Sequence, residues 1–202
     1  MDTMSTIAAK DVAELRKRTG AGMMDCKKAL QESSGNMEDA IDLLRKKGAA
    51  KAAKRAERSV KEGVIGNYVH FNGKVGVLVE VNCETDFVAR TDAFQNLARN
   101  VALHVASANP LAVNADDLPA DFVARERKII EEQVAESGKP EAVREKIVEG
   151  KMRKLAQEYA LVEQPFVKDD KMTVGELVKD VSATVGENVV VSRFVRFALG
   201  EE

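Results

Sequence analysis

The residue types that most often act as nucleophiles, bases or metal ligands are sparse in this 202-residue chain, which has two cysteines and two histidines. Cys26 and Cys83 lie far apart and lack the CxxC spacing of zinc and redox sites. The numbers of cysteine and histidine residues alone do not exclude a Cys–His nucleophile pair. Each cysteine falls on an apolar stripe, however, so both are predicted to be small core residues. His104 extends the stripe of a predicted helix and is expected to be packed, whereas His70 precedes a turn, where it is available to a partner.

The segment at residues 85–90, TDFVAR, has side chains suited to binding. It lies between the end of a predicted strand and a helical segment that Thr91 or Asp92 could cap. We expect a loop here, with the charge of Asp86 and the apolar ring of Phe87 side by side at its tip. The alternative is that Phe87 folds back under the sheet as a core residue.

A pair of methionines, Met23 and Met24, is a second feature of this kind. Adjacent helical residues point about 100° apart, so a helix that buries Met23 beside Cys26 and Leu30 turns Met24 outward next to Lys27. If Met23 is internal, Met24 is therefore expected to be exposed. Because exposed methionines are common, the pattern leaves open whether Met24 contacts a partner.

The N-terminal elements are predicted to be three short helices within residues 5–48. Ser5 or Thr6 is a candidate N-cap of the first helix, and Asn36 is a good N-cap for the third. The third helix is expected to end before Gly48.

From Val60 the apolar period changes to two, which indicates strands. The dipeptide Asn72-Gly73 is a strong hairpin signal between two strand patterns. One face of the second strand is predicted to carry Val75, Val77, Val79, Val81 and Cys83. Helical patterns then return, and the C-terminal run NVVVSRFVRFAL predicts a closing strand that joins the hairpin and offers apolar surface at Phe194, Val195 and Phe197.

These elements predict an α+β fold. Residues 1–55 are expected to form a helical bundle with a linker helix, and residues 56–202 a core with an antiparallel sheet and packed helices. The first 58 residues carry a net positive charge and the remainder a net negative charge, which favours two differently charged parts.

Composition and motifs argue against several classes of protein. Hydrophobic residues make up 45% of the chain and charged residues 32%, so a globular core is expected. Signatures of phosphate-binding loops, zinc proteases and serine hydrolases are absent from the sequence. No apolar stretch approaches the ~18 residues of a membrane span. We expect a soluble cytoplasmic protein that is not an enzyme, has no cofactor or metal and does not enter a membrane.

The basic run at residues 45–61 supports an alternative function, that of a nucleic-acid-binding module. Few aromatic residues are available to stack on bases, and Glu57 interrupts the run, so a solvated linker helix is the favoured interpretation. Steep salt dependence of RNA or DNA binding would mark the alternative, because phosphate contacts release counterions.

Two long strings, LRKRTGAGMMDCKKAL at 15–30 and VEVNCETDFVAR at 79–90, resemble signatures of the bacterial translation elongation factor Ts family. Shorter matches in family order extend the resemblance over nearly the whole chain: EGVIGNYVHFNGKVGVLV at 62–79, LVEQPFV at 161–167 and RFVRFALGE at 193–201. The resemblance implies a guanine nucleotide exchange factor for elongation factor Tu, a GTPase, with no catalytic chemistry of its own. It also implies that the N-terminal bundle is ubiquitin-associated-like.

The resemblance further implies roles for particular residues and an assembly. It assigns displacement of the Mg²⁺ ion at the partner's nucleotide site to Thr85, Asp86, Phe87 and Val88. It assigns docking on the partner's G domain to Arg16, Met23, Met24 and Lys27, and a further contact to His70. Longer members have two core subdomains and this chain has one, and short members pair through their cores. A homodimer that binds two copies of the partner is therefore implied, without direct contact to nucleic acid.

Overall fold

The computed structural model describes residues 7–19, 21–138 and 140–201, with residues 49–54 described by their backbone alone. The N-terminal part is a bundle of three helices, α1 (Ala9–Thr19), α2 (Met23–Glu32) and α3 (Met37–Ala56). Their facing sides enclose a small apolar cluster made of Val12, Leu15, Cys26, Ala29, Leu30 and Ala40. The candidate N-caps Ser5 and Thr6 lie outside the described residues.

Helix α3 begins where the sequence predicts and ends later. The Asn36 side chain accepts hydrogen bonds from the backbone of Glu38 and Asp39, as expected of an N-cap. The prediction that the helix ends before Gly48 is wrong, because the helix continues to Ala56. One internal glycine costs a helix only about 1 kcal/mol, and the alanine-rich run that follows has high helix propensity.

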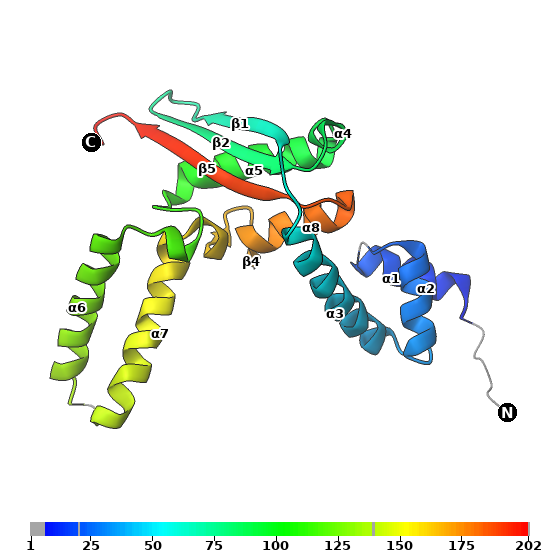
Figure 1. Cartoon of the computed structure of the whole chain (residues 1–202), viewed down its shortest axis with the longest axis horizontal. Helices are drawn as coiled ribbons and strands as arrows, with labels where there is room; N and C mark the ends of the chain where they lie inside the picture. The colour runs from blue at the N-terminus through cyan, green and yellow to red at the C-terminus, as the bar shows by residue number, and fades with distance from the viewer. Residues whose placement is uncertain (1–6, 20, 139, 202) are drawn as a thin grey trace.

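The centre of the molecule is a three-stranded antiparallel sheet of β1 (Glu62–Val69), β2 (Val75–Cys83) and β5 (Val190–Ala198), in the order β1-β2-β5. The hairpin at Asn72-Gly73 and the addition of the closing strand to it are both confirmed. The sheet lies over helix α5 (Asp92–Ala108), with β2 between the two other strands (Figure 1).

The inner face of the sheet packs on α5 and forms the main core. Val77, Val79, Val81 and Cys83 are buried there, and α5 contributes Phe94, Leu97, Val101 and His104. Strand β1 lies so close to α5 that a Cβ atom at Gly66 would be 2.7 Å from the carbonyl oxygen of Ala98. Only glycine fits at that position without moving the backbone.

Val195 and Phe197 are exposed on the outer face of the sheet, as predicted, whereas the prediction that Phe194 offers apolar surface is wrong. Adjacent strand residues point to opposite faces, so Phe194 lies beside Val79 on the inner face, where it packs against the core. The exposed apolar residues of the outer face are Ile65, Val69, Leu78, Val190, Val195 and Phe197.

Helices α6 (Ala120–Glu136) and α7 (Glu141–Tyr159) form an antiparallel pair that projects away from the sheet, on the opposite side from the N-terminal bundle (Figure 1). The pair has a cluster of its own, in which Ile130, Val134 and Val148 are buried. A short 3-10 turn, η1 (Ala115–Asp117), leads into it.

The chain returns to the core through a second 3-10 turn, η2 (Leu161–Glu163), and a small two-stranded sheet of β3 (Pro165–Phe166) and β4 (Asp169–Thr173). This small sheet is absent from the sequence prediction because its strands are too short to show a period. Helix α8 (Val174–Val185) follows, begins with a Thr173–Glu176 capping box and ends at Gly186 in the left-handed conformation.

Candidate functional site

The segment after β2 is a single capped turn of helix, α4 (Asp86–Ala89), rather than the predicted loop. The Thr85 side chain accepts a hydrogen bond from the backbone N–H of Val88 and so caps the turn. Thr91 then caps α5 in the same way, as the sequence predicts. Two N-caps six residues apart divide the segment into a short turn and a long helix.

Helix α4 has an inner and an outer side. Val88 and Ala89 are buried in the main core, whereas Asp86 and Phe87 point outward. The alternative that Phe87 packs under its own sheet is wrong, because the ring is 79% exposed. The Asp86 carboxylate lies 2.7 Å from the guanidinium of Arg90 one turn later, and both groups are exposed. The turn thus presents an acid and an aromatic ring on a support that the core holds.

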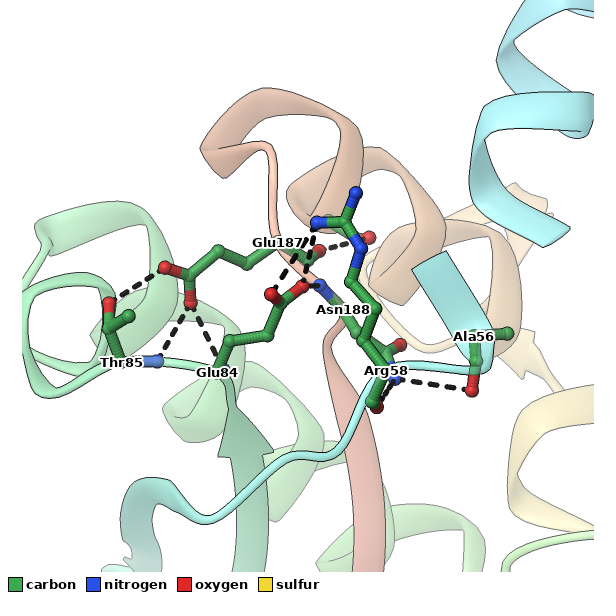
Figure 2. Close-up of polar contacts among 7 residues, drawn as sticks. Ala56, Arg58, Glu84, Thr85, Glu187 and Asn188 are labelled. Atoms are coloured by element: carbon green, nitrogen blue, oxygen red, sulfur yellow. Dashed lines mark hydrogen bonds and ion pairs between the residues drawn. The ribbon is translucent and has the colours of Figure 1, made fainter. Parts of the chain in front are cut away.

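The loop between α8 and β5 lies against this segment (Figure 2). The Glu187 carboxylate accepts hydrogen bonds from the backbone N–H groups of Glu84 and Thr85, at 3.0 and 3.1 Å, and from the Thr85 hydroxyl at 2.7 Å. Burial raises the pKa of the neighbouring Cys83 thiol, and the negative charge of Glu187 raises it further. That thiol therefore stays protonated and donates a hydrogen bond to the Thr85 carbonyl oxygen.

The residues of the bundle that the family resemblance assigns to docking are all exposed. Arg16 is on α1, and Met23, Met24 and Lys27 share the first turns of α2. Met23 does not join Cys26 and Leu30 inside the bundle: it is 56% exposed, and Met24 is 64% exposed. Met23 is the first residue of α2, one turn before the buried Cys26, and so lies beyond the packed part of the bundle.

His70 lies at the opposite end of the β1–β2 hairpin from Thr85. The nine residues of β2 separate the two ends by about 25 Å, so His70 and α4 cannot belong to one compact pocket. The His70 side chain is half-buried, and its Nδ1 atom is 3.0 Å from the Tyr68 hydroxyl. An apolar pocket of about 350 Å³ opens beside it, lined by Tyr68, His70, Val75, Leu103, Ala106, Ser107 and Val167.

The two cysteine and two histidine side chains do not pair with one another, because each has a different partner. Both thiols are buried and bond to backbone oxygens, while the ring of His104 bonds to Gln164 and to the backbone of Val167. Within the described ranges, no three His, Cys, Asp or Glu side chains are grouped so as to hold a metal ion. Among the described helices, none is long and apolar enough to cross a membrane.

Sequence reasoning does not find Glu84, Glu187 or Asn188, although they bond directly around this segment. The sequence contained one signal from which this contact could have been predicted. Because the closing strand pairs antiparallel with β2, the residues just before β5 must lie beside the residues just after β2. Polar residues in both positions, Glu84 and Glu187-Asn188, could therefore have been predicted to meet.

These features define a class of protein that acts by binding: an exposed acid and ring on a fixed support, with a separate helical bundle. A family model described as Elongation factor TS matches residues 2–201. The chain is 55% identical over 199 residues to elongation factor Ts of Solidesulfovibrio magneticus, which covers 98% of this chain and 100% of that protein. It is 55% identical over 195 residues to elongation factor Ts of Thermosipho melanesiensis, covering 96% of this chain and 100% of that protein.

The chain belongs to the elongation factor Ts family. Its function is that of a nucleotide exchange factor for elongation factor Tu in translation, and it is not an enzyme.

Proposed function

We propose that α4 and its cap, residues 85–88, are the element with which this chain opens the nucleotide site of elongation factor Tu. In this proposal Asp86 and Phe87 enter the partner and displace its Mg²⁺ ion. The observation that carries the proposal is the exposure of the Phe87 ring beside the Asp86 carboxylate, on a turn whose next two residues are buried. Thr85 and Val88 then hold the turn, as its cap and its anchor, and leave the contact to the two outward side chains.

Displacement of the ion is enough to explain release of the nucleotide. A bound divalent cation is often the largest local positive charge at a phosphate site, so its loss weakens the hold on a polyanionic nucleotide. The coupling is reciprocal: a factor that prefers the nucleotide-free partner lowers nucleotide affinity by the same ratio that nucleotide lowers the affinity of the factor. Burial of a Phe side chain contributes roughly 1.5–3 kcal/mol, or about ten- to a hundredfold in this ratio.

The bundle at residues 1–55 is proposed to dock on the G domain of the partner. Its exposed residues Arg16, Met23, Met24 and Lys27 offer apolar and basic contacts on a unit with its own core. His70 is proposed to make a separate contact at the far end of the hairpin. Docking and exchange are thus assigned to different parts of the chain, with exchange carried by the core at residues 56–202.

The core is also proposed to pair with a second copy of the chain, so that a homodimer binds two partners. The outer face of the sheet supports this, because a row of apolar side chains is exposed there and none of the described helices covers it. Leu78 and Val195 are direct cross-strand neighbours on this face, and Phe197 follows one row away. Such a face is buried when two sheets pack on each other.

Release of labelled GDP from elongation factor Tu, with and without the full chain, tests the proposal. The wild-type chain should accelerate release, and Phe87→Ala should accelerate it far less while melting at the wild-type temperature. Normal acceleration by a folded Phe87→Ala variant would refute the role of α4. In the basic run, Lys47 pairs with Glu32 and Arg58 pairs with Glu84, so two of its cations already have acidic partners.

A further inference from the structure

We infer that Glu187 is a positioning residue for nucleotide exchange: it fixes the direction in which the chain leaves β2 and so the place where Phe87 meets the partner. The inference rests on the proposed role of Phe87 and deepens it. Glu187 lies 100 residues after Phe87 in the sequence and reaches it through the backbone of Glu84 and Thr85.

Glu187 takes the place of a strand partner where the sheet ends. The ladder between β2 and β5 stops at the pair Asn82–Val190. Beyond it, the N–H groups of Glu84 and Thr85 both donate to one carboxylate oxygen of Glu187, and the Thr85 hydroxyl donates to the other (Figure 2). The three bonds therefore fix the backbone immediately before Asp86.

The contact is reciprocal. The Glu84 carboxylate accepts a 2.6 Å hydrogen bond from the backbone N–H of Asn188, so each of the two glutamates binds the backbone of the other segment. Arg58 lies 3.3 Å from the Glu84 carboxylate and supplies positive charge beside the two acids. The Asn188 side chain in turn donates to the carbonyl oxygen of Arg58 at 3.0 Å. Two consecutive residues of the loop between α8 and β5, Glu187 and Asn188, thus hold both α4 and the chain that leaves α3.

This network determines the position of α4 rather than its attachment to the protein, because the core already anchors α4. Val88 and Ala89 are buried in the main core, which does not include Glu187, so we expect the turn to stay attached to the protein without Glu187. The orientation of the turn is set at its other end, at Thr85, two residues before the exposed ring of Phe87. A small rotation there displaces the ring, and misplacement of a contact group by ~1 Å is enough to lose much of its effect.

Three substitutions at Glu187 separate positioning from charge. Glu187→Gln keeps the length of the side chain and an oxygen that accepts both backbone N–H groups, whereas its NH2 group can donate to the Thr85 hydroxyl. Glu187→Asp keeps the charge but withdraws the carboxylate by ~1.5 Å, beyond hydrogen-bond distance. Glu187→Ala removes both. We expect maximal GDP release by the Asp and Ala variants to slow about three- to tenfold, and release by the Gln variant to stay near wild type.

Glu132→Ala is the matched control, because it removes one exposed carboxylate from α6 and should leave release unchanged. Hydrogen exchange gives a second readout: the Glu84 and Thr85 amides should exchange faster in Glu187→Ala than in Glu187→Gln. If the Asp variant behaves as wild type and the Gln variant as Ala, the role of Glu187 is electrostatic and the inference is overturned. Should the Ala variant fail to fold, the comparison of Gln with Asp decides alone.

The double variant Phe87→Ala/Glu187→Ala tests whether Glu187 acts through Phe87. If it does, the double variant releases GDP no more slowly than Phe87→Ala. Multiplied effects would mean that the residues act independently and would overturn the inference. Normal release by Phe87→Ala would instead sink the proposed function, whereas slow release by Phe87→Ala with normal release by Glu187→Ala would sink the positioning role only.

Discussion

Phe87 and Val88 are consecutive residues of α4, yet the Phe87 ring is 79% exposed and Val88 is 5% exposed. Adjacent residues of a helical turn point about 100° apart, so a single turn against the core places one inside and the next outside. Phe87 and Val88 therefore report on two different properties of the segment. Truncation of the outer residue reports on partner binding, and truncation of the inner one reports on stability.

Phe87→Ala should slow GDP release about tenfold or more at fixed factor concentration, because the lost partner contact is worth roughly 1.5–3 kcal/mol. Its melting temperature should match wild type, since the ring makes little contact with its own fold. Val88→Ala is the matched control and should lower the free energy of unfolding by about 1–3 kcal/mol through the cavity it leaves. A loss of stability in Phe87→Ala together with normal exchange per folded molecule would contradict the assignment.

Met24→Asp should weaken the complex with elongation factor Tu without unfolding the bundle, because it places a charge in an apolar contact. We expect the half-saturating factor concentration to rise about tenfold and the maximal release rate to stay unchanged. Gln31→Asp, which adds the same charge at another exposed position of α2, is the control and should behave as wild type. A maximal rate that fell as sharply as the affinity would show that the bundle takes part in exchange itself.

Phe197→Asp should convert the proposed homodimer into a monomer. The substitution puts a charge on the outer face of the sheet, beside Leu78 and Val195, where a second sheet would have to bury it. Light scattering at micromolar concentration should report twice the chain mass for wild type and a single mass for the variant. Val143→Asp on α7 is the control and should remain dimeric. A wild-type chain of single mass would end the proposal.

The stability of the fold should fall as pH falls through the range in which free histidine titrates. Burial lowers the pKa of His104, whose Nδ1 atom accepts a hydrogen bond from the Val167 N–H and whose Nε2 atom lies 2.9 Å from the Gln164 side-chain oxygen. Neutral His104 therefore stabilises the fold above the unfolded-state pKa of about 6.5, and this contribution is lost as the unfolded chain takes up the proton at lower pH.

Urea unfolding on both sides of that pKa measures this dependence. The fall in unfolding free energy should be smaller in His104→Gln, which cannot take up the proton. An equal fall in the two proteins would assign the dependence to groups other than His104.

Local patterns predicted most of the elements correctly, because their causes lie within a few residues. The period of two in β2 identified the buried face with Val77 and Val79, and Asn36 and Thr91 cap the helices that follow them. The errors concern residues whose burial depends on parts of the chain that are distant in the sequence. Met23 fits the stripe of α2 but extends past the helices that could cover it, so its spacing carried no information on its burial.

The sequence by itself determined the order of helices and strands, the hairpin, the faces of α5 and β2 that form the core, and the strings shared with the family. Tertiary structure alone decided that the pairing of β5 with β2 shifts register opposite Glu80 and Val81 and that Glu187 binds the backbone beside α4. The physical reason is the separation along the chain between the residues that interact. Periods and caps depend on neighbours in the chain, whereas the bond from Glu84 to Glu187 spans 103 residues and exists only because β5 pairs with β2 in one register.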